Sequence, residues 1–282
     1  MLQVIIENKY GEQLNLSNSE YYDIVSVGGI TPPNATINTS IVAAQDGTMY
    51  NSSRLEQRNI TLLIVPKKGI ENSRINIYKY IKAKQYIKVY MKNGLRDVYI
   101  EGYVESIEAD LWTKTQNIQV SIICPNPFFK AKEIKTIEFS NVVSAFEFPF
   151  YSDEIGIPIS YISTFTEENV NNASDEEMGL IIHLHASGLV LRPTIYNQTT
   201  NEHFSINYEM KSGDIITINT RKGEKSLILK REGAEINIIN HMEKGSKWFN
   251  LRIEDNIYSY VCEFGAENLQ LRAEIQNIYV GV

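Results

Sequence analysis

The segment from residue 118 to residue 129, IQVSIICPNPFF, limits the fold of this chain more than any other. Its first seven residues alternate in the manner of a β-strand. The Pro-Asn-Pro sequence ends that strand, because each proline fixes φ and lacks an amide hydrogen. Two phenylalanines follow, where a flexible linker would have glycine, serine and charge. The segment predicts a stiff domain joint, made of Cys124, Pro125, Asn126, Pro127, Phe128 and Phe129.

A joint at this place divides the 282 residues into domains 1–130 and 131–282, each long enough for its own core. In this interpretation the two phenylalanines pack into one of the flanking bodies. The alternative is an ordinary strand-ending turn inside a single domain.

Composition excludes several classes of protein. The net charge is −7 and no dense lysine and arginine cluster occurs, so the electrostatic footprint of a nucleic-acid binder is missing. The N-terminus has no basic region of the signal-peptide type, and no apolar stretch approaches the roughly 20 residues that span a bilayer. Two distant cysteines, Cys124 and Cys262, argue against a disulfide scaffold. We expect a soluble, folded protein made in a reducing cytosol, with no membrane partner.

The first half of the chain predicts mostly strands, which β-branched residues and tyrosines favour. Residues 34–54 form a long polar hairpin with a turn at Asp46-Gly47, and Asn93-Gly94 marks a second hairpin. Residues 71–83 are the best helix candidate, capped by Asn72 or Ser73, although a strand also fits their alternation.

The second half predicts an antiparallel sandwich, because alternating runs recur at about ten-residue spacing with turns between them. Strand-like pieces between 134 and 150 end at Pro149, and residues 166–178 are predicted to be a polar, acidic loop. The residues predicted to point inward are Leu180, Ile182, Leu184, Phe204, Ile206, Tyr208, Met210, Ile216, Ile218, Leu227, Leu229, Ile236, Ile238, Phe249, Leu251, Ile253, Leu269, Leu271, Ala273 and Ile275.

No motif indicates catalysis, a cofactor or a metal. His183 and His185 share a strand face, but no third ligand follows, so two solvent-facing histidines are the favoured interpretation. The acidic segment 167–177 lacks the ligand spacing of a calcium loop. Trp248 is a weak candidate for stacking on a sugar, and a half-buried edge aromatic is the commoner case.

Several stretches, taken together and in order, resemble siphophage distal tail proteins. Those in the first half are Val25–Pro33, the Asp46-Gly47 turn, Arg54–Leu62 and Tyr99–Glu105. The Pro-Asn-Pro joint resembles that family's domain boundary, and those that resemble its second domain are Gly213–Arg221, Trp248–Leu251 and Ile278–Val282.

The resemblance implies a mainly β, non-enzymatic structural protein of a phage tail tip. The first domain, a split-barrel or sandwich-like fold with one helix, would form a hexameric ring, and the second would be a galectin-like β-sandwich. Copies of the chain itself, the tail tube protein, the tail-associated hub protein and receptor-binding or fibre proteins are the implied partners. The protein would be made in the bacterial cytoplasm and reside in the virion tail tip.

Candidate ring contacts follow from the same resemblance and from exposed aromatics, which serve interfaces well. They are Asp46, Gly47, Arg54, Tyr99, Tyr103 and Trp112. Long excursions such as residues 34–58 are expected to reach across to the next subunit and add a strand to its sheet.

Two other classes stay open at this point. A carbohydrate-binding accessory module would bind glycans without assembling, and a β-sandwich hydrolase would need two carboxylates converging in a cleft. The sugar-binding motif of galectins is absent, since Trp248 is followed by Phe-Asn-Leu and no glutamate stands three residues on.

Overall fold

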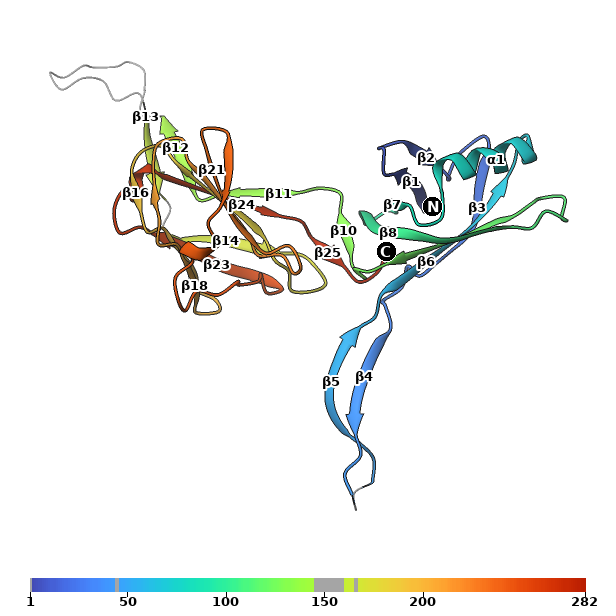
Figure 1. The fold of residues 1–282 in the computed structure, drawn as a ribbon, viewed down its shortest axis with the longest axis horizontal. Coiled ribbons are helices and arrows are strands. Elements are labelled where there is room, and N and C mark those ends of the chain that lie inside the picture. Colours follow the sequence, from blue (N-terminus) through green and yellow to red (C-terminus); the bar gives the residue numbers. More distant parts are fainter. Residues whose placement is uncertain (1, 44–45, 145–159, 165–166) are drawn as a thin grey trace. The chain divides into compact units, whose positions relative to one another are not determined.

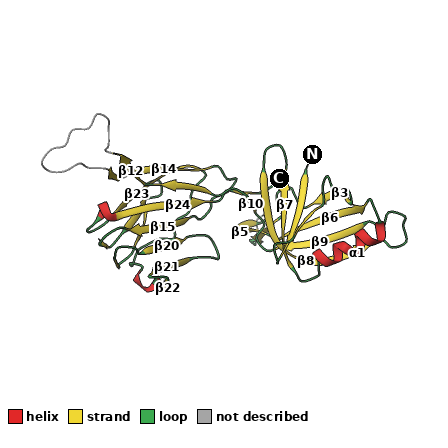
Figure 2. Ribbon diagram, turned by 90° about the horizontal axis from the view of Figure 1, so that it is seen from above, coloured by secondary structure: helices red, strands yellow, loops and turns green. Residues whose placement is uncertain are grey.

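The protein divides into two compact units in a computed structural model, which describes residues 2–43, 46–144, 160–164 and 167–282. The first unit comprises Met1–Glu133 and Ile278–Val282, and the second comprises Ile134–Asn277. The second unit is therefore inserted in the sequence of the first. Strands dominate both units (Figure 2), which confirms the predicted mainly β class.

The first unit is built around one antiparallel sheet (Figure 1). Its elements are β1 (Gln3–Asn8), β2 (Gln13–Asn15), β3 (Tyr22–Gly28), β4 (Ala35–Ser40), β5 (Met49–Leu55), β6 (Arg58–Pro66), α1 (Ile70–Tyr80), β7 (Tyr86–Lys92), β8 (Asp97–Ala109), β9 (Ile118–Cys124), β10 (Phe129–Ala131) and β25 (Ile278–Tyr279). The strand order is β2-β1-β7-β8-β9-β6-β3, and β10 pairs with both β8 and β25.

One face of this sheet forms the core of the first unit. Alternate residues of each central strand are apolar and fully buried, as in Ile118, Val120, Ile122 and Cys124 of β9, all at 0% exposure. Their burial is the main source of stability for the unit, since each large apolar side chain taken from water contributes about 1.5–3 kcal/mol.

Helix α1 confirms the helical interpretation of residues 71–83, although the helix ends at Tyr80. Ile77 and the adjacent Ile81 pack into the core at 0% exposure, four residues apart on one helical face. The predicted cap is wrong. Gly69, at φ 58°, is the N-cap, and the Ser73 hydroxyl donates to the Lys68 carbonyl oxygen at 2.6 Å.

The second unit contains the remaining strands. Its elements are β11 (Lys135–Glu138), β12 (Ser140–Ser144), β13 (Ser160–Thr164), β14 (Glu167–Asn172), β15 (Ile181–Ala186), β16 (Val190–Leu191), β17 (Thr194–Asn197), β18 (Glu202–Ser205), β19 (Glu209–Met210), β20 (Ile215–Asn219), β21 (Ser226–Arg231), β22 (Ala234–Asn237), η1 (Ile239–His241), β23 (Glu254–Val261), η2 (Ala266–Asn268) and β24 (Leu269–Ile275). The larger sheets have the orders β11-β24-β15-β20-β21-β22 and β14-β23-β17-β18, all antiparallel.

Most residues predicted to point inward form the core of this unit, with Phe204, Phe249 and Tyr258 in edge-to-face ring contact. Three predictions are wrong. Ile236 on the edge strand β22 is 45% exposed, Ile253 lies outside any strand and is 50% exposed, and Tyr208 is only half-buried. The strand end predicted at Pro149 falls outside the described residues.

The acidic loop predicted at 166–178 is wrong in its first half, because Glu167–Asn172 is strand β14. It pairs with β23 along its whole length and buries Val170 and Asn172. The Asn172 amide nitrogen donates to the carbonyl oxygens of Glu176, at 3.2 Å, and Leu251, at 3.3 Å, while its oxygen accepts from the Ser174 amide at 3.0 Å. A buried asparagine with all three partners thus anchors the turn after the strand.

Replacing Asn172 with alanine is expected to lower the free energy of unfolding by about 1–3 kcal/mol, because buried backbone groups lose their partners. Asn171→Ala is the matched control. Asn171 is the neighbouring residue, is exposed, and donates only to Asp255. Urea unfolding followed by circular dichroism measures both, and equal effects of the two variants would contradict this account of the turn.

Candidate assembly surface

A two-stranded ribbon, residues 35–55, is the most unusual surface of the first unit. Strands β4 and β5 pair with each other from Ala35–Leu55 to Ser40–Met49, and with no other strand in the part of the chain that the structure describes. Every residue of β5 is exposed, and so are most of those of β4. Short side-chain contacts bridge the two strands, such as the Asn38 amide donating to the Ser52 hydroxyl at 3.0 Å. The ribbon has no core of its own.

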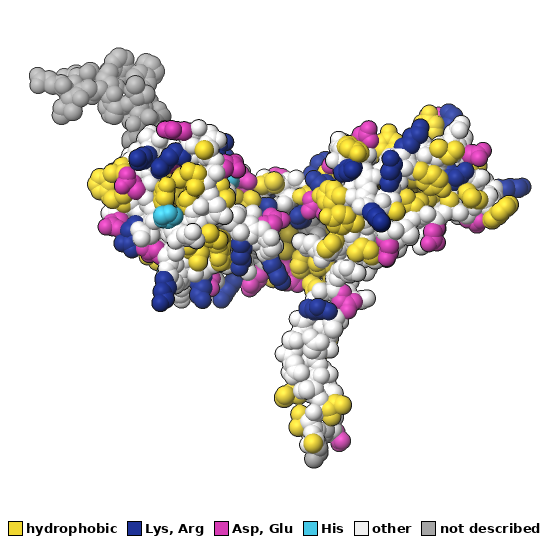
Figure 3. Space-filling model, in the orientation of Figure 1, with side chains coloured by type: hydrophobic (Ala, Val, Ile, Leu, Met, Phe, Trp, Pro, Cys, Tyr) yellow, Lys and Arg dark blue, Asp and Glu magenta, His cyan; other side chains and the backbone are white. Residues whose placement is uncertain are grey.

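The ribbon is nearly free of charge and exposes apolar side chains. Asp46 and Arg54 are its only charged residues. Figure 3 shows hydrophobic atoms gathered towards its free end. The exposed apolar residues are Ile37 (57%), Ile41 (85%), Val42 (39%), Met49 (56%), Tyr50 (61%) and Leu55 (40%). Such a surface offers two open strand edges and exposed apolar side chains, with few charges to oppose association.

The sequence-predicted contact residues lie in three separate segments. Asp46 and Gly47 form the tip of the ribbon, where Gly47 has φ 86°, and Arg54 lies on β5 opposite Thr36. Tyr99 and Tyr103 lie on β8, and Trp112 is 97% exposed in the loop between β8 and β9. The structure therefore brings only Asp46 and Gly47 directly together.

The two tyrosines belong to a polar aromatic face opposite the core. Tyr103 contacts Tyr86 edge to face, with ring centroids 5.8 Å apart, and Tyr99 contacts Tyr90 at 5.5 Å. Between the pairs, Glu101 accepts hydrogen bonds from the Tyr86 hydroxyl and the Lys130 ammonium, both at 2.7 Å. Burial opposes ionisation of Glu101, but these two donors lower its pKa overall. The pKa of the Tyr86 hydroxyl is raised, mainly by burial and then by its hydrogen bond to Glu101.

The base of the ribbon is held by Arg58, whose structural role sequence reasoning missed. Arg58 is 3% exposed, yet no carboxylate of the described residues contacts it. Its guanidinium donates instead to four backbone carbonyl oxygens: Gly29 at 2.5 Å, Thr31 at 2.6 Å, Pro127 at 2.7 Å and Val280 at 2.7 Å. Burial lowers its pKa. In the sequence, the only indication of this role is the position of Arg58, directly after the polar hairpin and at the start of a strand.

The predicted joint, residues 124–129, lies within the first unit. Cys124 is buried, which raises the pKa of its thiol to about 12, and Phe129 is buried 4.6 Å from the Arg58 guanidinium. After the Pro-Asn-Pro turn the chain returns to the same sheet as β10, and the second unit begins at Ile134. Phe128 is half-buried.

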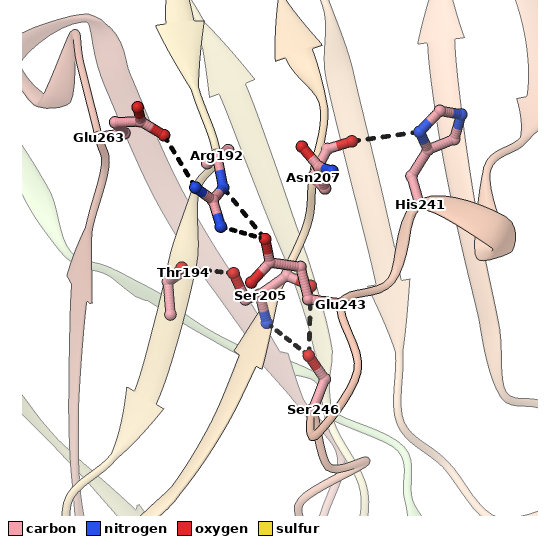
Figure 4. A network of polar contacts seen from close by, with 8 residues as sticks. All are labelled: Arg192, Thr194, Ser205, Asn207, His241, Glu243, Ser246 and Glu263. Atoms are coloured by element: carbon pink, nitrogen blue, oxygen red, sulfur yellow. Dashed lines mark hydrogen bonds and ion pairs between the residues drawn. The ribbon is translucent and has the colours of Figure 1, made fainter.

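In the second unit a polar network ties β17 and β18 to neighbouring loops (Figure 4). Arg192, at φ 47°, donates to Glu243 and to Glu263, the latter at 3.2 Å. The Thr194 and Ser205 hydroxyls lie 2.8 Å apart, and His241 Nδ1 lies 3.1 Å from the Asn207 carbonyl oxygen. Arg192 is paired with both carboxylates of the network, so its charge is compensated within the unit.

A shallow depression of about 480 Å³ adjoins this network, lined by Tyr208, Lys211, Arg231 and His241 among others. Beneath it Asp214, 1% exposed, forms a bidentate ion pair with Arg231 at 2.8 and 2.5 Å and caps the Lys211 amide at 2.7 Å. The Arg231 hydrogen bonds lower the pKa of Asp214 against the opposing effect of burial.

The weaker sequence candidates are accounted for by packing. Trp248 is half-buried and meets the Phe204 ring edge to face at 4.9 Å. His183 bonds Thr217 at 3.1 Å and lies 3.4 Å from Glu274 on the next strand; burial lowers its pKa. Among the described residues no group of three His, Cys, Asp or Glu side chains could hold a metal ion. No helix in that part of the chain is long and apolar enough to cross a membrane.

Comparison with known proteins supplies the class of this fold. Residues 173–272 match the family described as siphovirus-type tail component, C-terminal domain. A sequence search of curated proteins finds no significant match.

Solved structures extend the likeness over nearly the whole chain. The phage SPP1 Dit protein, titled a paradigm of the hub adsorption apparatus in phages that infect Gram-positive bacteria, has a TM-score of 0.69 and 11% identity, with 99% of each chain covered. Two structures of the phage P2 baseplate in its activated conformation, with Ca and with Sr, have TM-scores of 0.56 and 0.54 at 10% identity, covering 98% of each chain.

Residues 173–272 therefore resemble the siphovirus-type tail component family, within an antiparallel β fold similar to the SPP1 Dit and P2 baseplate structures. More particularly, the resemblance to distal tail proteins is confirmed, and the findings support a structural role in a phage tail tip or hub.

Asp214 gives a pH-dependent prediction for this unit. Its folded pKa is depressed, so its ion pair contributes stability above the ordinary carboxyl pKa of about 3.9, and that contribution is lost as the pH falls through the folded value. Asp214→Asn should lower the melting temperature at pH 7, and the difference from wild type should shrink below about pH 4. Asp255→Asn, at an exposed carboxylate, is the control. A difference that persists unchanged at pH 3 would refute the assignment.

Proposed function

We propose that this protein forms a homo-hexameric ring in a phage tail tip, joining the tail tube to the host-adsorption hub and its fibres. The observation that carries the proposal is the tail-component family match inside a chain whose fold follows a hub protein from end to end. Its partners would be further copies of itself, the tail tube protein, the hub protein and receptor-binding or fibre proteins. It would be made in the host cytoplasm.

The first unit is proposed to make the ring contacts, through the ribbon. An isolated two-stranded hairpin is marginally stable in water, so an exposed, nearly uncharged ribbon gains from a partner. A neighbouring sheet edge can satisfy its free backbone groups by strand addition. A head-to-tail contact repeated around a closed circle then makes a ring. Asp46, Gly47, Arg54, Tyr99, Tyr103 and Trp112 remain the candidate contact residues.

The second unit is proposed to be a galectin-like sandwich that does not self-associate. Support comes from the ion pairs of Arg192 and Arg231, which are satisfied within the unit. No catalytic function is proposed for either unit. The carbohydrate-binding alternative is not favoured by the comparisons, and the covered ring of Trp248 weakens its one sequence candidate.

Self-association of the full chain should be concentration-dependent and should weaken when the ribbon loses its apolar residues. Replacing Ile37 and Tyr50 together with serine is expected to raise the dissociation constant at least tenfold, because two exposed apolar side chains would no longer be buried at the contact. Tyr10→Ser, which removes a more exposed tyrosine (73%) outside the ribbon, is the control.

Analytical ultracentrifugation over a dilution series measures the effect. Assembly of the ribbon variant at wild-type strength would exclude the ribbon as the contact. A separately expressed fragment 134–277 that forms hexamers would reverse the assignment of the ring to the first unit.

A further inference from the structure

The ribbon is connected to the first unit at a point where three distant parts of the chain meet. Residues 29–34 lead into β4, and Glu56 and Gln57 lead from β5 to Arg58. Arg58 Nη1 donates to the carbonyl oxygens of Gly29 and Thr31, so the outgoing strand binds the incoming one. The Glu56 amide donates to the Asn34 carbonyl oxygen at 2.9 Å. This bond joins the two chain segments where they enter and leave the ribbon.

Residues 278–282 complete this base from the other end of the sequence. Arg58 Nη2 donates to the Val280 carbonyl oxygen, and the Val282 amide donates to the Ile30 carbonyl oxygen at 3.0 Å. A Cβ atom on Gly281 would lie 3.1 Å from the Ile30 carbonyl oxygen and 3.6 Å from Pro32 Cδ. The terminal segment therefore lies directly against the chain that enters the ribbon.

A further contact fixes that segment to the sheet. Arg96 donates to the Gly281 carbonyl oxygen, and its guanidinium lies 4.3 Å from the Tyr279 ring. Tyr279 pairs with Phe129, whose ring lies under Arg58. The base of the ribbon, the Pro-Asn-Pro turn and the terminal segment thus share one set of contacts.

We propose that Arg58 and residues 278–282 form a latch that fixes the direction in which the ribbon leaves the first unit. The inference rests on the proposed function in one respect, that the ribbon is the surface offered to a neighbouring copy. The ribbon pairs with no other strand among the described residues, so its direction depends on its base. With about 3.3 Å of rise per residue, six residues extend about 20 Å, so a turn of 20° at the base moves the tip by about 7 Å.

The order of the sequence gives the latch a consequence for assembly. Residues 278–282 follow the whole second unit, so the latch cannot close until residues 134–277 have been made. A ribbon with no fixed direction cannot meet every neighbour at the same angle, which a closed ring requires. Assembly would therefore be confined to chains whose synthesis has continued beyond the second unit.

The test measures the direction of the ribbon in the full chain, independently of assembly. Spin labels at Thr48→Cys, near the ribbon tip, and Lys79→Cys, on α1, report a distance by pulsed electron resonance in protein diluted with unlabelled chain. Cys262 is replaced with serine, while Cys124 stays, because its thiol is fully buried.

Two variants disturb the latch in different ways. Arg58→Met removes the four hydrogen bonds, and Gly281→Val pushes the terminal segment from Ile30 while keeping Arg58. Lys130→Met, which breaks the ion pair with Glu101 in the same sheet, is the control. We expect the distance distribution to broaden at least twofold in both latch variants and to stay unchanged in the control.

Unchanged distributions in folded Arg58→Met and Gly281→Val proteins would overturn the latch. If Arg58→Met does not fold, Gly281→Val decides alone, since it leaves the core residues in place. The distance readout separates this inference from the proposed function. A wild-type chain that never self-associates would refute the ring and leave the latch standing, whereas lost assembly with an unchanged distribution would refute the latch alone.

Discussion

The buried guanidinium of Arg58 is the interaction on which the arrangement of the first unit depends. Taking an unpaired charge out of water costs several kcal/mol unless the protein replaces its hydration. Here four carbonyl oxygens and the face of Phe129 take the place of water. Because the planar guanidinium directs its donors along fixed lines, the three backbone segments that supply these oxygens must meet in one geometry. A lysine has neither the reach nor the planar fork to do the same.

This constraint explains why the first unit is discontinuous in sequence. The bond from Arg58 to Val280 joins residues 222 positions apart, and β25 pairs with β10 across the inserted unit. The loop-closure entropy of so long a separation rises only slowly with length, so the inserted unit adds little to its thermodynamic cost. Its kinetic effect is larger, since non-local contacts form late in folding. The central sheet can form early, and the base of the ribbon closes last.

Alternation in the sequence was sufficient to predict the strands whose two faces differ. Ile118 to Cys124 and Leu269 to Ile275 are buried in the predicted pattern, because period-two burial is a property of a half-buried sheet. Strand β14 was not predicted, because Val170 is its only apolar residue and the others are charged or amide side chains. One apolar residue gives no alternating pattern. Residues 278–282 were placed with the second domain, but a two-residue strand has no period to reveal its partner.

The candidate surface could be predicted only in outline for a related reason. The turn at Asp46-Gly47 marks a hairpin, yet nothing local says that its strands lack a third neighbour. That follows from tertiary structure, where the edges of β4 and β5 pair only with each other. The scarcity of charge on the ribbon makes strand addition inexpensive, because few ionic groups would have to be desolvated. A surface designed to stay exposed would have carried lysines on its edges. The ribbon has one arginine and one aspartate in 21 residues. This composition fits a segment that is removed from water when a neighbouring subunit binds it.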